Sequence, residues 1–431
     1  MGAFVTVRKY LGAAALTGVC LACGFAAQPT HAQTVGLYEL ARFSLSSTAT
    51  SSNPEFIGSN PIAVGWNGSK LYVAGFNGSG STANTSIVEI TNASGVTTGT
   101  LSGVVTPTYS STFGGISTAT TRGYTGLSMK GSQLAASYDG GSNTPTAIQV
   151  FDAASSNAKS WDLANSGSAT ANIGTSRGMS GPAFDPGYQG NAAQGSGVAW
   201  VTQGQGRRFL NNASTGAGIY TTTAGTPAGA AQGMIINTNP VSSTWRDFAF
   251  DPATGDLYTR NQVGVTRTVR TGANTSQNPL TDPPTAGQSG VIWTQPVAAN
   301  NVATNVAYAS GVAAATVGSF TNPYAGDLLV FNDRSSTAAG QAWTSVIKFA
   351  TPTGTLLTPD YTFISAPLNG NSAYDFEWDS TTQTLAVLDY ANRNVHIFTT
   401  AVPEPTTWAL LGTVGISTGG AMLRRRWKRR G

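Results

Sequence analysis

Cysteine, histidine and charged residues are all scarce in this chain of 431 residues. The two cysteines, Cys20 and Cys23, both lie in the first apolar run, so the region after it has no thiol for a disulfide, a zinc site or a nucleophile. The only histidines are His31 and His396, which excludes His-cluster metal sites and most histidine-dependent catalytic triads. Carboxylates are therefore the main candidates for any chemistry.

Charged residues make up 10% of the chain, against roughly 25% in an average soluble protein. Long amphipathic helices need many Glu, Lys, Arg and Leu, so this composition excludes a helical bundle. The chain contains 52 glycines without a period of three, which excludes collagen. Abundant Gly, Ser, Thr and Asn instead favour short strands joined by tight turns.

The formal charge of +4 arises from the two ends of the chain. Between Gln33 and Val402 there are 15 basic and 18 acidic residues, a net charge of −3. Nucleic-acid binding needs positive charge gathered on the folded region, and this region has no such excess. We therefore expect no nucleic-acid partner.

The N-terminus has the three parts of a Sec signal peptide. Arg8 and Lys9 precede an apolar run over residues 10–27, and Thr30-His31-Ala32 ends on a small residue suited to cleavage. The sequence predicts a signal peptide over residues 1–32, with Ala27 as the second choice of cleavage site. A retained membrane anchor is the alternative, and Gln28-Pro29 argues against it by breaking the run. The expected partners are the Sec translocon and signal peptidase.

The C-terminus also has three parts. The motif Val-Pro-Glu-Pro at 402–405 is followed by an uncharged run at 406–423 and a basic segment at 424–430. Eighteen helical residues reach about 27 Å, barely enough for a single transmembrane helix through a hydrocarbon core of ~30 Å. Basic residues after an apolar run stay in the cytoplasm, so residues 33–402 are expected on the outer side of the inner membrane.

This tail resembles the PEP-CTERM sorting signal of Gram-negative bacteria. The resemblance implies that Pro403, Glu404 and Pro405 are recognised by an exosortase, which removes the tail during export. It also implies only transient contact with the inner membrane, and a role in the cell envelope or extracellular matrix linked to exopolysaccharide and biofilm systems. An ordinary tail anchor, as in a permanently anchored receptor-like protein, is the alternative.

The region 33–401 contains a repeat of about 60 residues. Residues 245–258 align without a gap with residues 373–386, and both segments have the period-two alternation of a β-hairpin around an Asp-initiated turn. Weaker copies give six units, which predicts an all-β, six-bladed β-propeller. A seventh blade within 264–319 is the nearest alternative, and a β-sandwich or β-helix fits the repeat length poorly. The second strand of each unit is expected to start at Leu71, Leu134, Val198, Leu257, Leu328 and Leu385.

The last unit ends after three strands, whereas the expected mature N-terminus has one strand to spare, over residues 37–43. We expect this strand to pair beside the strand that contains His396 and so to close the ring, because an open sheet edge promotes aggregation. His396 itself is expected to be packed rather than catalytic.

Two acids, Asp247 and Asp375, occupy the same position in the aligned units. With Glu377, and with Asp139 and Asp389 as further candidates, they could gather at the mouth of the central channel. Such a cluster would bind Ca²⁺ through oxygen ligands or form a general acid/base pair. The alternative is turn chemistry, in which an Asp side chain accepts bonds from backbone donors, as expected for Asp185, Asp251 and Asp379.

The sequence thus favours a non-enzymatic exported protein with a binding or scaffolding role. The alternative is a metal-assisted hydrolase or lactonase-like propeller with carboxylates at the channel mouth. Tryptophans exposed on the surface would stack on sugar rings, although we expect most of them to pack between blades. Those of the central region are Trp66, Trp161, Trp200, Trp245, Trp293, Trp343 and Trp378.

Overall fold

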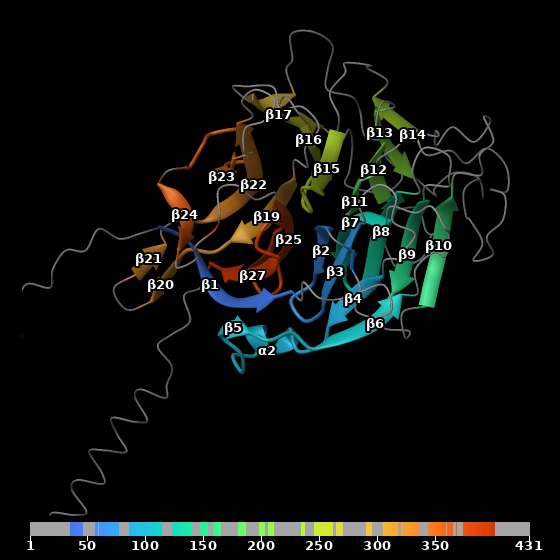
Figure 1. Cartoon of the computed structure of the whole chain (residues 1–431). Coiled ribbons are helices and arrows are strands. Elements are labelled where there is room, and N and C mark those ends of the chain that lie inside the picture. Colours follow the sequence, from blue (N-terminus) through green and yellow to red (C-terminus); the bar gives the residue numbers. More distant parts are fainter. Residues whose placement is uncertain are drawn as a thin grey trace, which may run out of the picture.

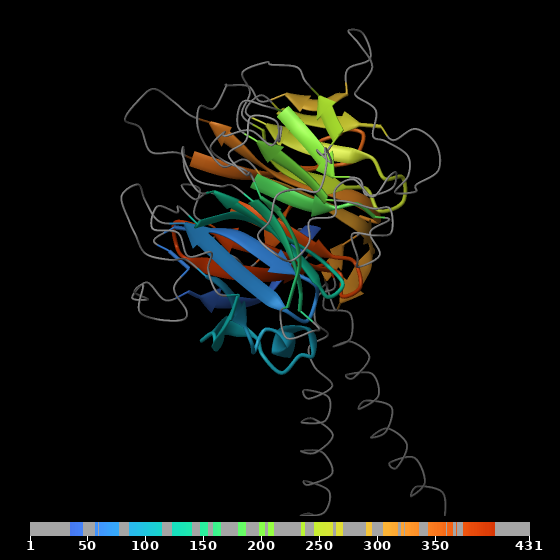
Figure 2. The same cartoon turned by 90° about the vertical axis from the view of Figure 1, so that its right-hand side faces the viewer.

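The structure is a computed structural model, and the strands that it describes surround a central axis (Figures 1 and 2). No helix in the described ranges is long and apolar enough to cross a membrane. The predicted signal peptide with Ala32 and the sorting motif Pro403, Glu404 and Pro405 lie outside those ranges. The structure describes residues 35–45, 57–58, 60–76, 86–113, 123–139, 147–153, 158–164, 180–186, 198–202, 206–210, 234–237, 245–261, 264–269, 290–294, 305–317, 320–322, 324–335, 344–358, 360–364, 368 and 374–400.

The described strands form five sheets of three or more strands and one two-stranded ribbon. The largest sheet has eight strands, in two antiparallel sets of four that are joined through a single residue pair, Phe76 with Gly123. Its first set is β2 (Asn60–Trp66), β3 (Leu71–Phe76), β4 (Ile87–Ile90) and β6 (Tyr109–Phe113), with the short helix α2 (Ser94–Thr97) after β4; its second set is β7 (Gly123–Lys130), β8 (Gln133–Asp139), β9 (Ala147–Asp152) and β10 (Ala158–Ala164).

Three further sheets continue the ring, and each is antiparallel throughout. They consist of β11 (Ser180–Phe184), β12 (Val198–Thr202), β13 (Gly206–Leu210) and β14 (Met234–Asn237); of β15 (Trp245–Phe250), β16 (Leu257–Asn261), β17 (Gly264–Thr268) and β18 (Val291–Thr294); and of β19 (Val306–Val312), β22 (Gly326–Ser335) and β23 (Thr344–Ala350). The ribbon pairs β20 (Ala315–Val317) with β21 (Phe320–Asn322).

The last sheet joins the two ends of the described chain. It contains β25 (Tyr374–Asp379), β26 (Thr384–Asp389) and β27 (Asn394–Thr399), and β27 pairs antiparallel with the N-terminal strand β1 (Val35–Ser44). Arg42 lies opposite His396 in this pairing, so the predicted closing strand is confirmed. His396 is buried, with its Nδ1 2.6 Å from Oε1 of Glu39 on β1.

Strand β1 does not present a free edge. Its outer side pairs in parallel with β24 (Tyr361–Ile364) over Val35–Tyr38 and with β5 (Gly103–Val105) over Ala41–Phe43. The closing strand is therefore held between β27 and two short strands that come from other parts of the chain. This arrangement covers the kind of edge that promotes aggregation.

Among the described strands, six inner strands contact one another in the order β2, β7, β11, β15, β19, β25 and back to β2. All the second strands begin within two residues of the predicted positions. In the described parts of 264–319, β17 and β18 complete one sheet and β19 opens the next. The further pairing there is the two-stranded ribbon of β20 with β21, which is shorter than a blade.

The turns after β15 and β25 have the same construction, as the sequence repeat predicts. The hydroxyl of Thr254 donates to Oδ2 of Asp251 at 2.8 Å, and that of the aligned Thr382 donates to Oδ2 of Asp379 at 2.6 Å. The backbone N–H of each threonine also donates to the same Asp side chain, at 3.2 and 2.7 Å. Gly255 and Gln383, which align in the two segments, both take positive φ values, of 77° and 56°. Turn chemistry is thus confirmed for these two acids.

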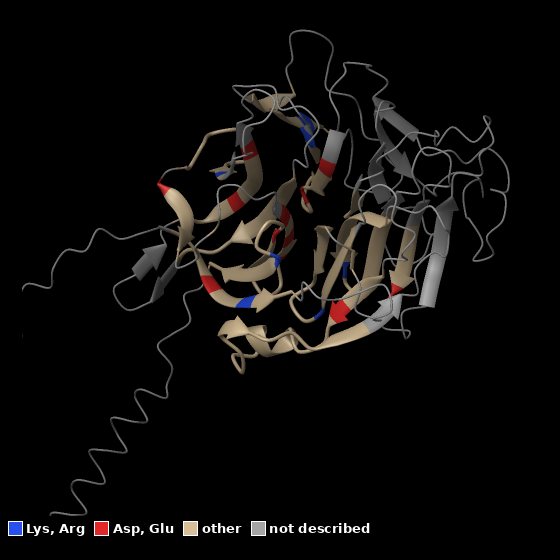
Figure 3. Cartoon of the chain, viewed as in Figure 1, with Lys and Arg blue, Asp and Glu red and all other residues tan. Residues whose placement is uncertain are grey.

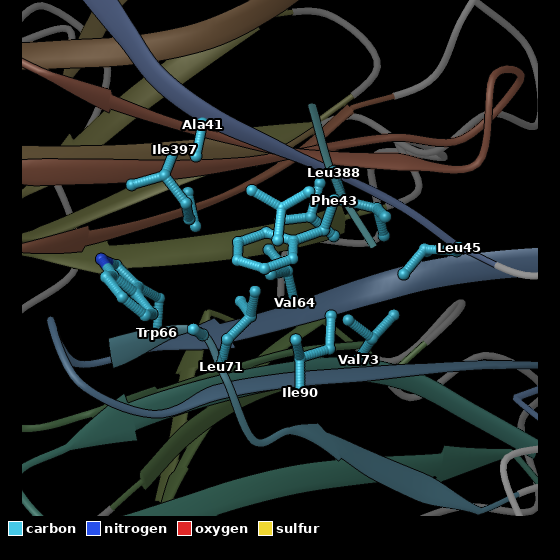
Figure 4. Packing of buried hydrophobic residues seen from close by; sticks show 14 of the residues in the cluster. Ala41, Phe43, Leu45, Val64, Trp66, Leu71, Val73, Ile90, Leu388 and Ile397 are labelled. Atoms are coloured by element: carbon cyan, nitrogen blue, oxygen red, sulfur yellow. The ribbon is translucent and has the colours of Figure 1, made fainter. Parts of the chain in front are cut away.

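Charged residues are sparse along the described strands (Figure 3), and the core lies between the sheets. One buried cluster joins the closing sheet to the first strand set: Phe43 of β1 and Leu388 of β26 pack with Val64 of β2 and Leu71 and Val73 of β3 (Figure 4). Strand β1 therefore closes the ring through core packing as well as through strand pairing.

We predict that Phe43→Ala lowers the free energy of unfolding by about 3–5 kcal/mol, because Phe43 is completely buried in this cluster. The neighbouring change Ser44→Ala, at an exposed position of the same strand, is expected to stay within about 0.5 kcal/mol of the unmodified protein. Urea unfolding measures both, and equal effects would contradict a closing role for β1.

Candidate functional site

Asp247 and Asp375 form hydrogen bonds between neighbouring inner strands. Oδ2 of Asp247, on β15, accepts the backbone N–H of Val306 on β19 at 2.9 Å. Oδ2 of Asp375, on β25, accepts the N–H of Val64 on β2 at 2.8 Å. Each acid reaches the next inner strand around the ring, so the two aligned positions have equivalent roles. Both residues are only 7% exposed.

The inner strands need such acceptors because the innermost strand of a sheet in a ring has one edge without a ladder partner. A buried N–H on that edge is costly unless it finds an acceptor. The carboxylates supply acceptors where the sheets do not. This structural use explains why the repeat carries an acid at these positions.

Asn305 connects the two acids, and no feature of the sequence pointed to it. Its Nδ2 donates to Oδ1 of Asp375 at 2.6 Å, and its own backbone N–H donates to Oδ1 of Asn332 at 2.7 Å. The next residue, Val306, donates to Asp247. Asn305 lies just before β19, in none of the segments that show the repeat.

Glu377 bonds across the ring instead of to the next strand. Its Oε1 accepts the N–H of Met129 at 3.0 Å and the hydroxyl of Ser128 at 3.2 Å, both on β7. Strand β7 is two places from β25 in the order of inner strands. The three acids therefore link β25 to β2 and β7, and β15 to β19.

Burial dominates the electrostatics of these acids. It raises the pKa of Asp375 to about 7 and the pKa of Asp247 well above its ordinary value, and for Asp247 the charge of Asp375 adds to the effect. The pKa of Glu377 is also raised well above its ordinary value, by burial and then by the charges of Asp375 and Asp247. The enclosed carboxyl groups thus favour their neutral forms.

The predicted cation site is not formed by these residues. Across the described ranges, no three His, Cys, Asp or Glu side chains are placed to hold a metal ion. Asp389 is buried and accepts bonds from Asn392, the residue three positions on, as a turn residue does. Asp139 lies at the end of β8, opposite Gly123 in the ladder.

A cavity of about 310 Å³, here called the channel pocket, lies where the inner strands end. Glu377 lines it, whereas Asp247 and Asp375 do not. The carboxyl-terminal parts of β2, β7, β11, β15 and β25, the turns that follow most of them, and part of β19 supply its wall. The aromatic residues of the wall are Trp66, Phe184, Phe248, Phe250, Tyr308, Phe376 and Trp378, and the polar ones include Asn67, Ser128, Lys130, Glu377, Asp379, Ser380 and Thr381.

Lys130 is fixed at the pocket wall by backbone oxygens. Its Nζ donates to the carbonyl oxygen of Asp185 at 2.9 Å and also to that of Pro186. Burial lowers the pKa of Lys130 to about 8, an effect that the charge of Asp185 opposes. The pocket thus combines a held ammonium group with a carboxyl group that favours its neutral form.

The tryptophans whose side chains are described differ in exposure. Trp66 is buried and donates from Nε1 to the hydroxyl of Thr384 at 2.8 Å, across the boundary between two sheets. Trp293 is partly buried, with its ring 5.1 Å from the guanidinium carbon of Arg260. Trp378 is half-buried at the pocket and donates to the carbonyl oxygen of Ser310 at 3.2 Å. Packing between sheets is confirmed for Trp66, and Trp378 is the one of these three that lines the pocket while retaining exposure.

The solved structures that this chain is similar to are distant from it. No protein-family model and no curated protein matches the chain. Three solved structures that resemble it are an auxiliary nutrient binding protein from Bacteroides thetaiotaomicron (13% identity, 80% of this chain and 69% of that chain, TM-score 0.41), the WD40 β-propeller domain of Doa1 (8%, 80% and 81%, 0.38) and a DUF4623 family protein from Bacteroides eggerthii (12%, 83% and 74%, 0.41). The strand pairing and the closed order of inner-strand contacts make the chain an all-β protein with a β-propeller fold. Likenesses this distant say nothing about its ligand.

The raised pKa of Asp375 predicts a pH-dependent stability. Between pH 4 and pH 7 the folded chain keeps a proton on this group that the unfolded chain, with a pKa near 3.8, releases. Raising the pH through this window therefore lowers the free energy of unfolding, by at most about 1.4 kcal/mol per pH unit for one group. Asp375→Asn is expected to reduce that slope in urea unfolding measured across the window.

Asn at position 375 can be accommodated because Oδ1 of Asn305 has no bonding partner among the described residues, and a flipped Asn305 amide would accept from the new side chain. The control is Asp360→Asn, which removes the same charge at an exposed position and should leave the slope unchanged. An unchanged slope in Asp375→Asn would refute the assignment.

Proposed function

We propose that this chain is an exported protein of the cell envelope or extracellular matrix whose propeller binds a small polar ligand in the channel pocket. The observation that carries the proposal is the pocket itself, because segments from every inner strand contribute to its wall. Its volume of about 310 Å³ falls at the lower end of small-molecule sites, about 300–1,000 Å³.

The chemistry of the wall favours a sugar-like ligand. Trp378 is half-buried and lines the pocket, where an aromatic ring can stack on a sugar, and Ser380 and Thr381 are exposed on the same rim. The carboxyl group of Glu377, whose Oε1 already accepts bonds from Ser128 and Met129, also lines the pocket and suits ligand hydroxyl groups. The volume accommodates the end of a glycan rather than a long stretch, so terminal units of exopolysaccharide are the proposed ligand.

The export route in this proposal rests on the sequence. It comprises cleavage after Ala32, recognition of Pro403, Glu404 and Pro405 by an exosortase, and transient contact of residues 406–423 with the inner membrane.

We also propose that the ring has six blades. The eight-stranded sheet divides into two four-stranded sets at a single residue pair, and each set contributes one inner strand, β2 or β7. Counting the sets separately gives one blade for each of the six inner strands. The hydrolase alternative has less support, because Asp247 and Asp375 are engaged with backbone donors and lie outside the pocket wall.

We predict that Trp378→Ala weakens binding of a size-fractionated exopolysaccharide hydrolysate by about tenfold, which corresponds to about 1.4 kcal/mol. The physical reason is the loss of the stacking face, so Trp378→Phe should keep most of the affinity. Isothermal titration calorimetry of the purified chain measures both changes.

The control for this titration is Val104→Ala, at a position in β5 that is 67% exposed and does not line the pocket. It should bind as the unmodified protein does. Equal losses in Val104→Ala and Trp378→Ala, or no binding by the unmodified protein, would contradict the proposed ligand site.

A further inference from the structure

The two ends of the described chain lie at the same end of the strands in the closing sheet. The strand registers pair Asp379 with Thr384, Thr384 with Thr399, and Thr399 with Tyr38. These four residues therefore form one row across β25, β26, β27 and β1. The start of β1 and the end of β27 belong to the same end of the blade.

That end of the blade is the one with the channel pocket. Asp379 and the two residues after it line the pocket rim. Adjacent strands lie about 4.8 Å apart, so Thr399, two strands away, is about 10 Å from Asp379. The chain end is also bonded to the rim turn: the Thr399 hydroxyl and the Thr400 N–H both donate to the carbonyl oxygen of Gln383, at 3.1 and 3.4 Å.

The distance from this row to the tail is short. Six residue steps separate Thr400 from Thr406, the first residue of the uncharged run, and six extended residues span at most about 20 Å. As long as residues 406–423 are in the membrane, Thr400 cannot be farther than this from the bilayer surface. The end of the closing sheet that carries part of the pocket rim is consequently the end tethered to the bilayer.

We propose that the uncleaved tail holds the channel pocket against the bilayer, and that removal of the tail uncovers the pocket. This inference rests on the proposed export and processing of the chain. The proposed partner of the pocket face before processing is thus a lipid surface. Processing would then both release the protein and make it able to bind.

The scarcity of cysteine allows a direct test. A chain that begins at Gln33 has no thiol, so Ser380→Cys places a unique thiol on the exposed pocket rim. Ala391→Cys is the matched control, because Ala391 is exposed in the β26–β27 turn at the opposite end of the same blade. Each variant also carries a protease site after Val402 and is reconstituted through its tail into phosphatidylcholine vesicles.

The measurement is the rate of labelling by a bulky polyethylene-glycol maleimide before and after cleavage at the inserted site. We expect Ser380→Cys to label severalfold more slowly than Ala391→Cys while anchored, and the two rates to become equal after release. In vesicles with a quencher on the lipid headgroups, a dye at Ser380→Cys should be quenched more strongly than one at Ala391→Cys.

Equal labelling rates in the anchored form would overturn the inference, as would a difference that persists after release. The underlying processing is tested separately by the intact mass of the exported protein. A mass for residues 33–402 supports removal of the tail, and a retained tail refutes the processing while the labelling result still reports which face lies on the membrane.

Discussion

The pairing of the first described strand with the last is the constraint on which the ring depends. A sheet in a ring buries its faces only against its neighbours, so an open junction would expose apolar surface on both sides. Strand β1 closes the junction by pairing with β27, and it is itself covered by β24 and β5. Phe43 extends the closure into the core shared with β2 and β3. The covering strands come from distant parts of the chain, so the closure draws on several elements.

A second requirement follows from ring geometry. The inner edge of each blade carries backbone donors that no ladder satisfies, and burial makes them costly. Asp247, Asp375 and Glu377 accept bonds from Val306, Val64 and Met129 respectively. These acids are themselves buried, and burial raises their pKa values. A chain with few charged residues thus uses three of them to hydrogen-bond its inner strands to one another. Of these three acids, only Glu377 also lines the pocket.

Much of the fold could be predicted from the sequence because its signals are local. The aligned segments 245–258 and 373–386 revealed the hairpins, and the spare strand at 37–43 revealed the closure. The candidate site was predicted only in part. Asp247 and Asp375 were identified as equivalent, yet alignment says nothing about bonding partners, which lie 59 and 311 residues away. Asn305 and Lys130 gave no signal, because their roles depend on which segments the ring brings together.

The central claim is that β1 is an integral part of the ring. Hydrogen–deuterium exchange of the chain from Gln33 to Val402 tests it directly, since amides in a core strand exchange only with global unfolding. The account predicts that amides of Val35–Ser44 exchange as slowly as those of Thr384–Asp389 in β26. Rapid exchange throughout β1 while β26 remains protected would show that the ring is stable without its closing strand, and would contradict the account.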